Sequence, residues 1–165
     1  VSTTYALDNQ DVLAGLICES FAFRVPAPRA VLSIIKGISR IFPHLPVLKL
    51  KNRDFTRDPA TLQRLETDPM IAGEIQPAAT VAALVRADER LEREFGRIAL
   101  PVLILHGTAD KATVPAGSEQ FAREAGSNDK TLKLYQGHYH DLLADLGKEE
   151  VLQDMLDWIE TRIAH

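Results

Sequence analysis

Two mainly apolar runs, each followed at once by a polar loop, constrain the fold of this chain more than any other feature. They cover residues 100–106 (LPVLILH) and residues 131–135 (TLKLY). A third apolar run covers residues 13–23, and its few polar interruptions are typical of a strand that is buried on both faces. Helical patterns separate the runs, so the order is strand, helical insertion, strand, helix, strand, helix. That order predicts an α/β fold with a doubly wound parallel sheet.

The spacing of the first two predicted strands indicates a second structural unit. Roughly seventy residues separate these strands, which is too many for a simple crossover between neighbours in a sheet. We therefore predict that residues 1–25 and 96–165 form the α/β core and that residues 26–95 form an inserted helical cap. A last helix is expected at residues 148–164. Its inward side is predicted to carry Val151, Leu152, Met155, Leu156, Ile159 and Ile163.

The composition argues against several classes of protein. The 165 residues suffice for one domain with a core, and 45% of them are hydrophobic. A net charge of -4 without a basic run argues against a partner made of nucleic acid. The single cysteine, Cys18, allows no internal disulfide, and without a Cys/His cluster we expect no metal and no cofactor. No apolar stretch reaches the roughly 18 residues of a membrane span, and we expect a cytoplasmic protein.

An acid and a histidine follow the two best-defined strands. Asp110 comes four residues after His106, and His140 comes five residues after Tyr135. Because the carboxyl ends of parallel strands meet at one edge of a sheet, we expect these two side chains to meet there. A carboxylate that accepts a hydrogen bond from one imidazole nitrogen leaves the other nitrogen able to take a proton. Taken singly, Asp110 is also a common turn former, and His140 is also compatible with a structural role.

Three sequence blocks carry a resemblance to a known family. The blocks LILHGTADKATVP, LKLYQGHYHDLLAD and GKEEVLQDMLDWI resemble the C-terminal part of α/β-hydrolases of the monoacylglycerol lipase group, the lysophospholipase-like hydrolase 4 family. LAGLICESFAF and RDPATLQRLETDPMI extend the resemblance over essentially the whole chain. The resemblance implies that Asp110 is the acid and His140 the base of a catalytic triad. It also implies a serine carboxylester hydrolase that acts on monoacylglycerols or related esters.

The third member of such a triad is expected outside this chain. A serine nucleophile of this family lies on a Gly-x-Ser-x-Gly turn, and no serine of the chain has those flanking glycines. We expect the nucleophile in a segment upstream of Val1, and we expect the chain alone to be inactive. Ser20, at the end of the first strand, is a weak candidate whose more natural role is packing or hydrogen bonding near the pocket.

Two other histidines compete for the role of base. His138 lies two residues before His140, and both side chains point the same way in an extended segment. The family pattern of a histidine followed by an acid and two leucines favours His140. His106 is expected to be a structural or pocket-wall residue.

The predicted cap contains the candidate substrate-binding residues. Ile34, Ile38 and Ile41 form an apolar stripe at helical spacing, which suits either packing on the core or a channel for an acyl chain. The resemblance favours the channel. Peripheral contact of the cap with a lipid surface is a further expectation. Glu74 suits either an exposed position on the cap or a contact with a glycerol hydroxyl, and Ala112 is expected at the mouth of the pocket.

Two alternative functions remain open at this point. One is another hydrolase of the same fold, such as a small-ester esterase or a haloperoxidase-like enzyme, since one fold carries many chemistries. The other is a binding or scaffold protein, or a fragment, in which the site is vestigial. A Gly-x-Ser-x-Gly turn upstream of Val1 distinguishes the enzymes from this last class.

Overall fold

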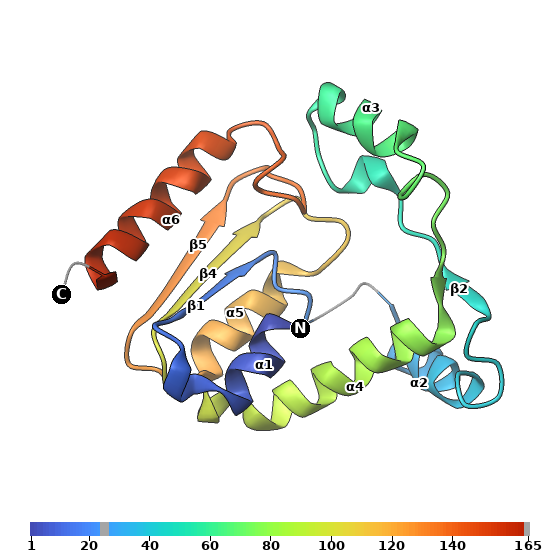
Figure 1. Ribbon diagram of the computed structural model, residues 1–165, viewed down its shortest axis with the longest axis horizontal. Helices are drawn as coiled ribbons and strands as arrows, with labels where there is room; N and C mark the ends of the chain where they lie inside the picture. Colours follow the sequence, from blue (N-terminus) through green and yellow to red (C-terminus); the bar gives the residue numbers. More distant parts are fainter. Residues whose placement is uncertain (24–26, 164–165) are drawn as a thin grey trace.

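The core of the computed structural model, which describes residues 1–23 and 27–163, is the predicted α/β layer structure. In this part of the chain, a parallel sheet has the strand order β1-β4-β5, with β1 at Leu16–Glu19, β4 at Val102–Gly107 and β5 at Lys130–Tyr135. Helices cover both faces of the sheet (Figure 1). On one face lie α1 (Ser2–Asp8) and α5 (Pro115–Glu124), and on the other lies α6 (Lys148–Ile163).

The central position of β4 in the sheet explains why the sequence of this strand is apolar without alternation. All of its side chains are buried. Val102 and Ile104 belong to the core cluster on the side of α1 and α5, whereas Leu103 and Leu105 belong to the cluster beneath α6. Because β1 and β5 flank this strand and helices cover both of its faces, every position must be apolar or paired.

The first strand is shorter than predicted. The apolar run at residues 13–23 predicted one continuous strand, but β1 ends at Glu19. Ser20 has a φ of 45°, in the left-handed region, and this conformation turns the chain out of the sheet. The rings of Phe21 and Phe23 then pack in the core, each 4.8 Å from a partner ring, Phe121 and Phe95 respectively. The run is apolar because it fills the core, and only part of it forms a strand.

The inward side of α6 also differs from the prediction. Val151 is fully buried, and Met155 and Trp158 pack with it beneath the sheet. Leu152, Leu156 and Ile163, which were predicted to face inward, are exposed, so that prediction was wrong. The six predicted residues span more of the helix surface than one contact face can cover, and the bulk of Trp158 decides the rotation.

The predicted cap region contains three helices and a short antiparallel ladder in the described residues. The helices are α2 (Arg29–Ile38), α3 (Pro59–Thr67) and α4 (Ala78–Glu94), and the ladder pairs β2 (Pro46–Leu48) with β3 (Gln76–Pro77). Helix α2 packs on α4, which runs back to the core (Figure 1).

The boundaries of the predicted cap are the points where the chain leaves the core and returns to it. Leu91 and Phe95, at the end of the cap region, already belong to the main core cluster. The other predicted boundary, between residues 25 and 26, lies outside the described residues, and so does the last residue of the predicted helix 148–164. The division into core and cap stays a prediction.

Candidate active site

Asp110 forms a turn and holds a histidine at the same time. Its Oδ1 accepts the backbone N–H groups of Ala112 (2.7 Å) and Thr113 (2.9 Å), which shapes the loop after β4. Its Oδ2 accepts the hydroxyl of Thr113 (2.8 Å) and lies 2.8 Å from His140 Nδ1. Asp110 therefore has both of the roles that the sequence suggested. Its Oδ1 stabilises the turn, and its Oδ2 orients the histidine.

The sheet brings Asp110 and His140 together as predicted. The Asp110 side chain is fully buried, and that of His140 is 20% exposed. Because an ionised carboxylate can only accept, His140 Nδ1 carries the hydrogen and Nε2 is the acceptor. The structure thus supplies an oriented imidazole with an available nitrogen. The catalytic roles of the two residues stay a prediction.

Asp110 and His140 stabilise each other's charged forms. Burial alone would raise the pKa of Asp110, but the contacts with His106, His140 and the Thr113 backbone hold that pKa well below its usual range. Burial alone would lower the pKa of His140, but the hydrogen bond and charge of Asp110, helped by Glu19, raise it overall. The carboxylate therefore stays ionised and stabilises the charged form of the imidazole.

The loop that carries His140 is held by the end of β1. Ser20 Oγ donates to the carbonyl oxygen of His140, and Glu19 Oε1 accepts the N–H of Leu142 (2.7 Å). Ser20 thus has the hydrogen-bonding role that the sequence favoured over nucleophilic attack. The strained φ of Ser20 lies directly beside the candidate base, where such conformations are common.

The contact between Asp110 and His140 requires that the loop after β5 lies close to the end of β4. A side-chain carbon on Gly107, at the end of β4, would lie 2.4 Å from the carbonyl oxygens of both His138 and Tyr139. Only glycine allows the loop after β5 to lie this close to the end of β4.

The cap region contacts His140 through a segment that sequence reasoning missed. The ring of Phe55 meets the ring of His140 edge to face at 5.0 Å, and the Phe55 carbonyl accepts the N–H of Asp141 (2.8 Å). Asp145, whose side chain is fully buried, accepts from Arg57 Nε (2.8 Å) and from the backbone N–H of Tyr139 (2.9 Å). No local pattern points to the contacts of Phe55 and Arg57, because these two residues lie more than 80 positions before their partners in the sequence.

The competing histidines lie in different surroundings. The ring of His138 lies 5.6 Å from that of Tyr135 and packs on Gly147, and its Nδ1 has no hydrogen-bond partner within the described residues. It makes no contact with Asp110 there, so the geometry favours His140 as the base. His106 is fully buried, with Nε2 3.0 Å from Asp110 Oδ2.

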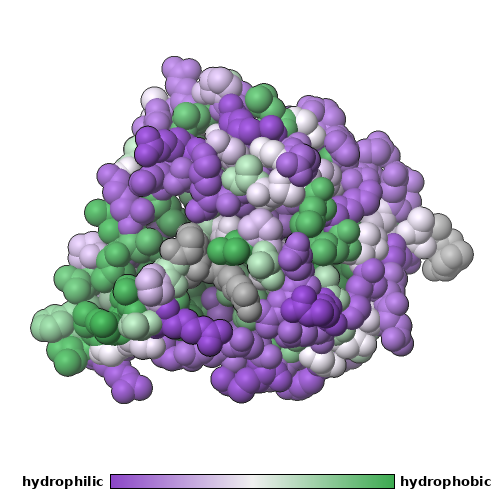
Figure 2. Space-filling model, turned by 180° about the vertical axis from the view of Figure 1, so that it is seen from behind, coloured by the Kyte–Doolittle hydropathy of each residue, from purple (hydrophilic) through white to green (hydrophobic). Residues whose placement is uncertain are grey.

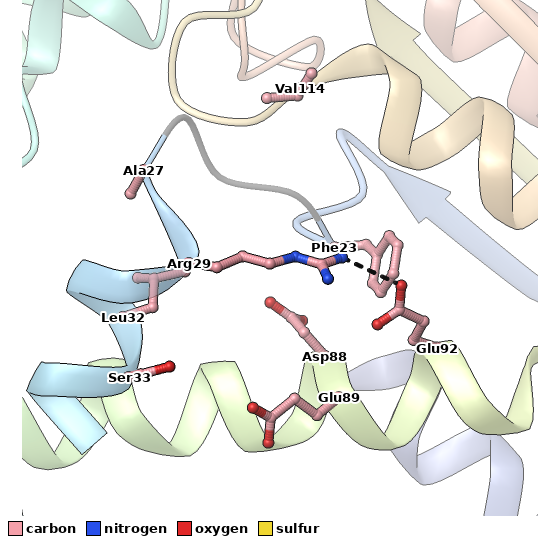
Figure 3. A pocket seen from close by; sticks show the side chains of 9 residues that line it. All are labelled: Phe23, Ala27, Arg29, Leu32, Ser33, Asp88, Glu89, Glu92 and Val114. Carbon is pink, nitrogen blue, oxygen red and sulfur yellow. Dashed lines mark hydrogen bonds and ion pairs between the residues drawn. The ribbon is translucent and has the colours of Figure 1, made fainter. Parts of the chain in front are cut away.

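A cavity of about 490 Å³ lies between α2, α4 and the ends of β1 and the Asp110 loop. Arg29 extends across it toward Glu92, with Nη2 3.5 Å from Oε1 (Figure 3). Asp88 and Glu89 point toward the same space from α4 (Figure 3). Burial raises the pKa of Asp88 to about 7, so this wall of the cavity loses negative charge near neutral pH.

The predicted substrate-binding residues fall in three different places. Ile34 and Ile41 are 61% and 73% exposed, and Ile38 is partly buried, so within the described residues they form no closed channel. Leu32 and Ser33 of the same helix line the 490 Å³ cavity instead. Ala112 donates its backbone N–H to Asp110 Oδ1 (2.7 Å). The substrate contacts of these residues stay a prediction.

Glu74 lines a smaller cavity of about 280 Å³ beside Phe55. Its Oε1 accepts from Gln76 Nε2 (2.9 Å), and Leu65 and Ile71 add apolar walls. Phe55 links this cavity to His140, since the two rings are in contact. Glu74 thus lines a cavity that shares Phe55 with the surroundings of the candidate base.

The match to a family model decides the family. The model described as Hydrolase_4, serine aminopeptidase, S33, matches residues 1–147. The chain belongs to the Hydrolase_4 family. The resemblance that the sequence blocks carried, to α/β-hydrolases of the monoacylglycerol lipase group, is thereby confirmed.

Several known proteins are similar to this Hydrolase_4 chain. Caffeoylshikimate esterase of Arabidopsis thaliana is 32% identical over 133 residues, which are 79% of this chain and 40% of that protein. Monoglyceride lipase of Mus musculus is 25% identical over 169 residues, which are 99% of this chain and 56% of that protein. The crystal structure of Paleococcus ferrophilus monoacylglycerol lipase matches with a TM-score of 0.88 at 29% identity, over 96% of this chain and 63% of that one.

The chain spans about half the length of the curated relatives that it matches. The α/β-hydrolase fold is shown, whereas the activity of the whole protein is a matter for proposal. No helix in the described part of the chain is both long and apolar enough to cross a membrane.

Proposed function

We propose that the protein is a serine carboxylester hydrolase in which Asp110 and His140 act with a serine upstream of Val1. The single observation that carries the proposal is the 2.8 Å contact between His140 Nδ1 and the buried carboxylate of Asp110. This pair is the acid–histidine part of a triad, in the order acid then histidine that the α/β-hydrolases use. The relatives named as esterases and lipases support the same reaction class.

The residues of this chain would move two protons, one in each half of the reaction. As the serine oxygen attacks the ester carbonyl, His140 Nε2 takes the serine proton, and the charged ring is stabilised by Asp110. The ring then gives the proton to the departing alcohol, which leaves an acyl-serine. Water then attacks the acyl group while His140 Nε2 takes a proton from it, and the ring gives that proton to the departing serine oxygen, which releases the acid and restores the serine.

Monoacylglycerols are the substrates that we propose first. The cavity beside Phe55 combines apolar walls with the carboxylate of Glu74, which suits a glycerol group whose hydroxyls need an acceptor. The relatives named monoglyceride lipase support this choice. A second candidate is an ester of an aromatic acid or another small ester, which is favoured by the similarity to caffeoylshikimate esterase.

A panel of substrates tests the reaction and separates the candidates. The full-length protein is expected to hydrolyse a monoacylglycerol, p-nitrophenyl butyrate and methyl caffeate at different kcat/KM values, with the monoacylglycerol highest. Glu74→Gln is expected to raise KM for the monoacylglycerol about fivefold, because one neutral acceptor replaces a charged one, and to leave KM for p-nitrophenyl butyrate unchanged.

Controls accompany the panel. The 165-residue chain by itself is expected to hydrolyse none of the three esters faster than buffer, and turnover by it would mean that a serine of this chain is the nucleophile. A preference for methyl caffeate would select the second candidate. No hydrolysis by the full-length protein would favour a vestigial site in a binding protein.

Contact with a lipid surface through the cap belongs to the same proposal. In the rear view, hydrophobic side chains gather over the end of the molecule that α2 occupies (Figure 2). The exposed apolar residues in and after this helix are Val31, Ile34, Ile41, Phe42, Leu45 and Leu48. An apolar patch of this kind can enter the outer part of a membrane and present the site to its lipid substrate.

Vesicle sedimentation checks this contact. Ile34→Glu and Ile41→Glu are each expected to weaken binding to phosphatidylcholine vesicles roughly tenfold, since each loses the burial of an isoleucine side chain. Leu156→Glu, on the exposed side of α6, is the matched control and should bind like the unchanged protein. An equal loss in all three variants would contradict a specific role for α2.

A further inference from the structure

A second histidine contacts the candidate triad acid. His106 lies in β4, its side chain is fully buried, and its Nε2 is 3.0 Å from Asp110 Oδ2. Its other ring nitrogen, Nδ1, lies 2.7 Å from Ser118 Oγ on α5. The side chains of Ser118, His106, Asp110 and His140 therefore form a continuous polar chain that runs from the interior of the protein to the candidate base.

The chemistry of the partners assigns the hydrogens in this chain. Asp110 is ionised and can only accept, so the His106 nitrogen that faces it, Nε2, carries a hydrogen. In the neutral ring, Nδ1 is then the acceptor, and the Ser118 hydroxyl donates to it. Ser118 thus holds His106 in the tautomer that presents an N–H group to the carboxylate.

The contacts of Asp110 leave its carboxylate no freedom to turn. Oδ1 takes the backbone N–H groups of Ala112 and Thr113. Oδ2 faces His140 Nδ1, Thr113 Oγ1 and His106 Nε2. Of these groups, only His106 approaches from the strand rather than from a loop. Rotation of the carboxylate would break contacts on both oxygens at once, and the Asp110 side chain is fully buried.

We propose that His106, oriented by Ser118, is a positioning residue that fixes the Asp110 carboxylate and thereby the orientation and basicity of His140. The proposal rests on the proposed function, in which Asp110 and His140 are the acid and base. Here His106 touches neither the substrate nor the serine and acts only through Asp110. Simple core packing would not require a polar ring 3.0 Å from Asp110, since an apolar residue fills the same space without a buried polar group to satisfy.

Two amide variants separate the two contacts of the imidazole ring, because each places an amide group at the position of one ring nitrogen. In His106→Gln the amide nitrogen reaches the position of Nε2, so the contact with Asp110 is kept. In His106→Asn the amide reaches only the position of Nδ1, so the contact with Ser118 is kept and that with Asp110 is lost. Both variants leave a buried polar side chain of similar size, which makes each the control for the other.

The first readout needs no substrate. The imidazole of His140 is titrated by NMR in protein with labelled histidines. His106→Asn is expected to move the His140 midpoint to higher pH, because the carboxylate loses a donor and its full negative charge then stabilises the imidazolium. His106→Gln is expected to titrate like the unchanged protein. Equal midpoints in all three proteins would overturn the proposal, and so would a glutamine variant that behaves like the asparagine variant.

The second readout uses the full-length protein with an ester substrate. His106→Asn is expected to lower kcat about tenfold with KM unchanged, and to move the acid limb of the pH profile with the NMR midpoint. If the asparagine variant does not fold, Ser118→Ala decides: a raised His140 midpoint supports the proposal, and an unchanged one overturns it. Absence of hydrolysis by the unchanged protein would refute the proposed function alone, because the titration does not depend on it.

Discussion

Replacing His140 by alanine is expected to abolish ester hydrolysis by the full-length protein, with kcat reduced about 10⁴-fold. Within the described residues, the variant loses the one imidazole that both contacts Asp110 and is partly open to solvent. No other group at this position can take the proton of the attacking serine. The measurement is kcat with a monoacylglycerol or p-nitrophenyl butyrate, made on folded protein checked by circular dichroism.

His138→Ala is the matched control for that prediction. Its ring is two residues away in the sequence but packs against Tyr135 and Gly147 rather than Asp110. The variant is expected to keep most of the activity and to lose some stability, because a buried ring is removed. If His138→Ala were inactive and His140→Ala active, the role of base would pass to His138.

Replacing Asp110 by asparagine is expected to lower kcat by about 10⁴ as well, for a different reason. The amide keeps the volume of the carboxylate but can donate through one of its two terminal atoms, so it can hold His140 in the wrong tautomer. The negative charge that raises the pKa of His140 is also lost. The residual activity should therefore extend to lower pH, since the ring stays neutral and able to accept a proton further into the acid range.

Thr113→Val is the control for the Asp110 variant. It removes the hydroxyl that donates to Asp110 Oδ2 at 2.8 Å and leaves the charge in place. We expect a loss of about tenfold or less in kcat and little change in the pH profile. A loss in Thr113→Val as large as that in Asp110→Asn would show that loop geometry, rather than the charge of Asp110, determines the activity.

The sequence predicted the elements best where a single local property decides them. Strand β4 is apolar at every position but His106 and Gly107 because it is covered on both faces, and its assignment was correct. Helix α3 starts at Pro59 with Asp58 as its cap, whose carboxylate accepts the N–H groups of Ala60 and Thr61. Such patterns lie within a few neighbouring residues, so they can be identified before the tertiary structure is known.

The predictions failed where packing chooses between equivalent local options. Residues 13–23 and the apolar positions of α6 are hydrophobic enough for several arrangements. The aromatic cluster of Phe21 and Phe23 shortens β1, and Trp158 selects the face of α6 that meets the sheet. Hydrophobicity indicates that a residue can be buried, but only contact with a partner of matching shape decides whether it is.

The sequence by itself determined the fold class and the meeting of Asp110 with His140. Both follow from parallel strands, whose carboxyl ends share one edge, so that two loops far apart in the chain must meet. The tertiary structure alone decided what surrounds the pair: His106 beneath the carboxylate, Phe55 on the imidazole, and Asp145 joining Arg57 across 88 residues of sequence. These contacts depend on how separate segments pack, a property that no local pattern records. The two strands β4 and β5 thus predict the acid–histidine chemistry, and the packing around them determines how the two side chains are oriented.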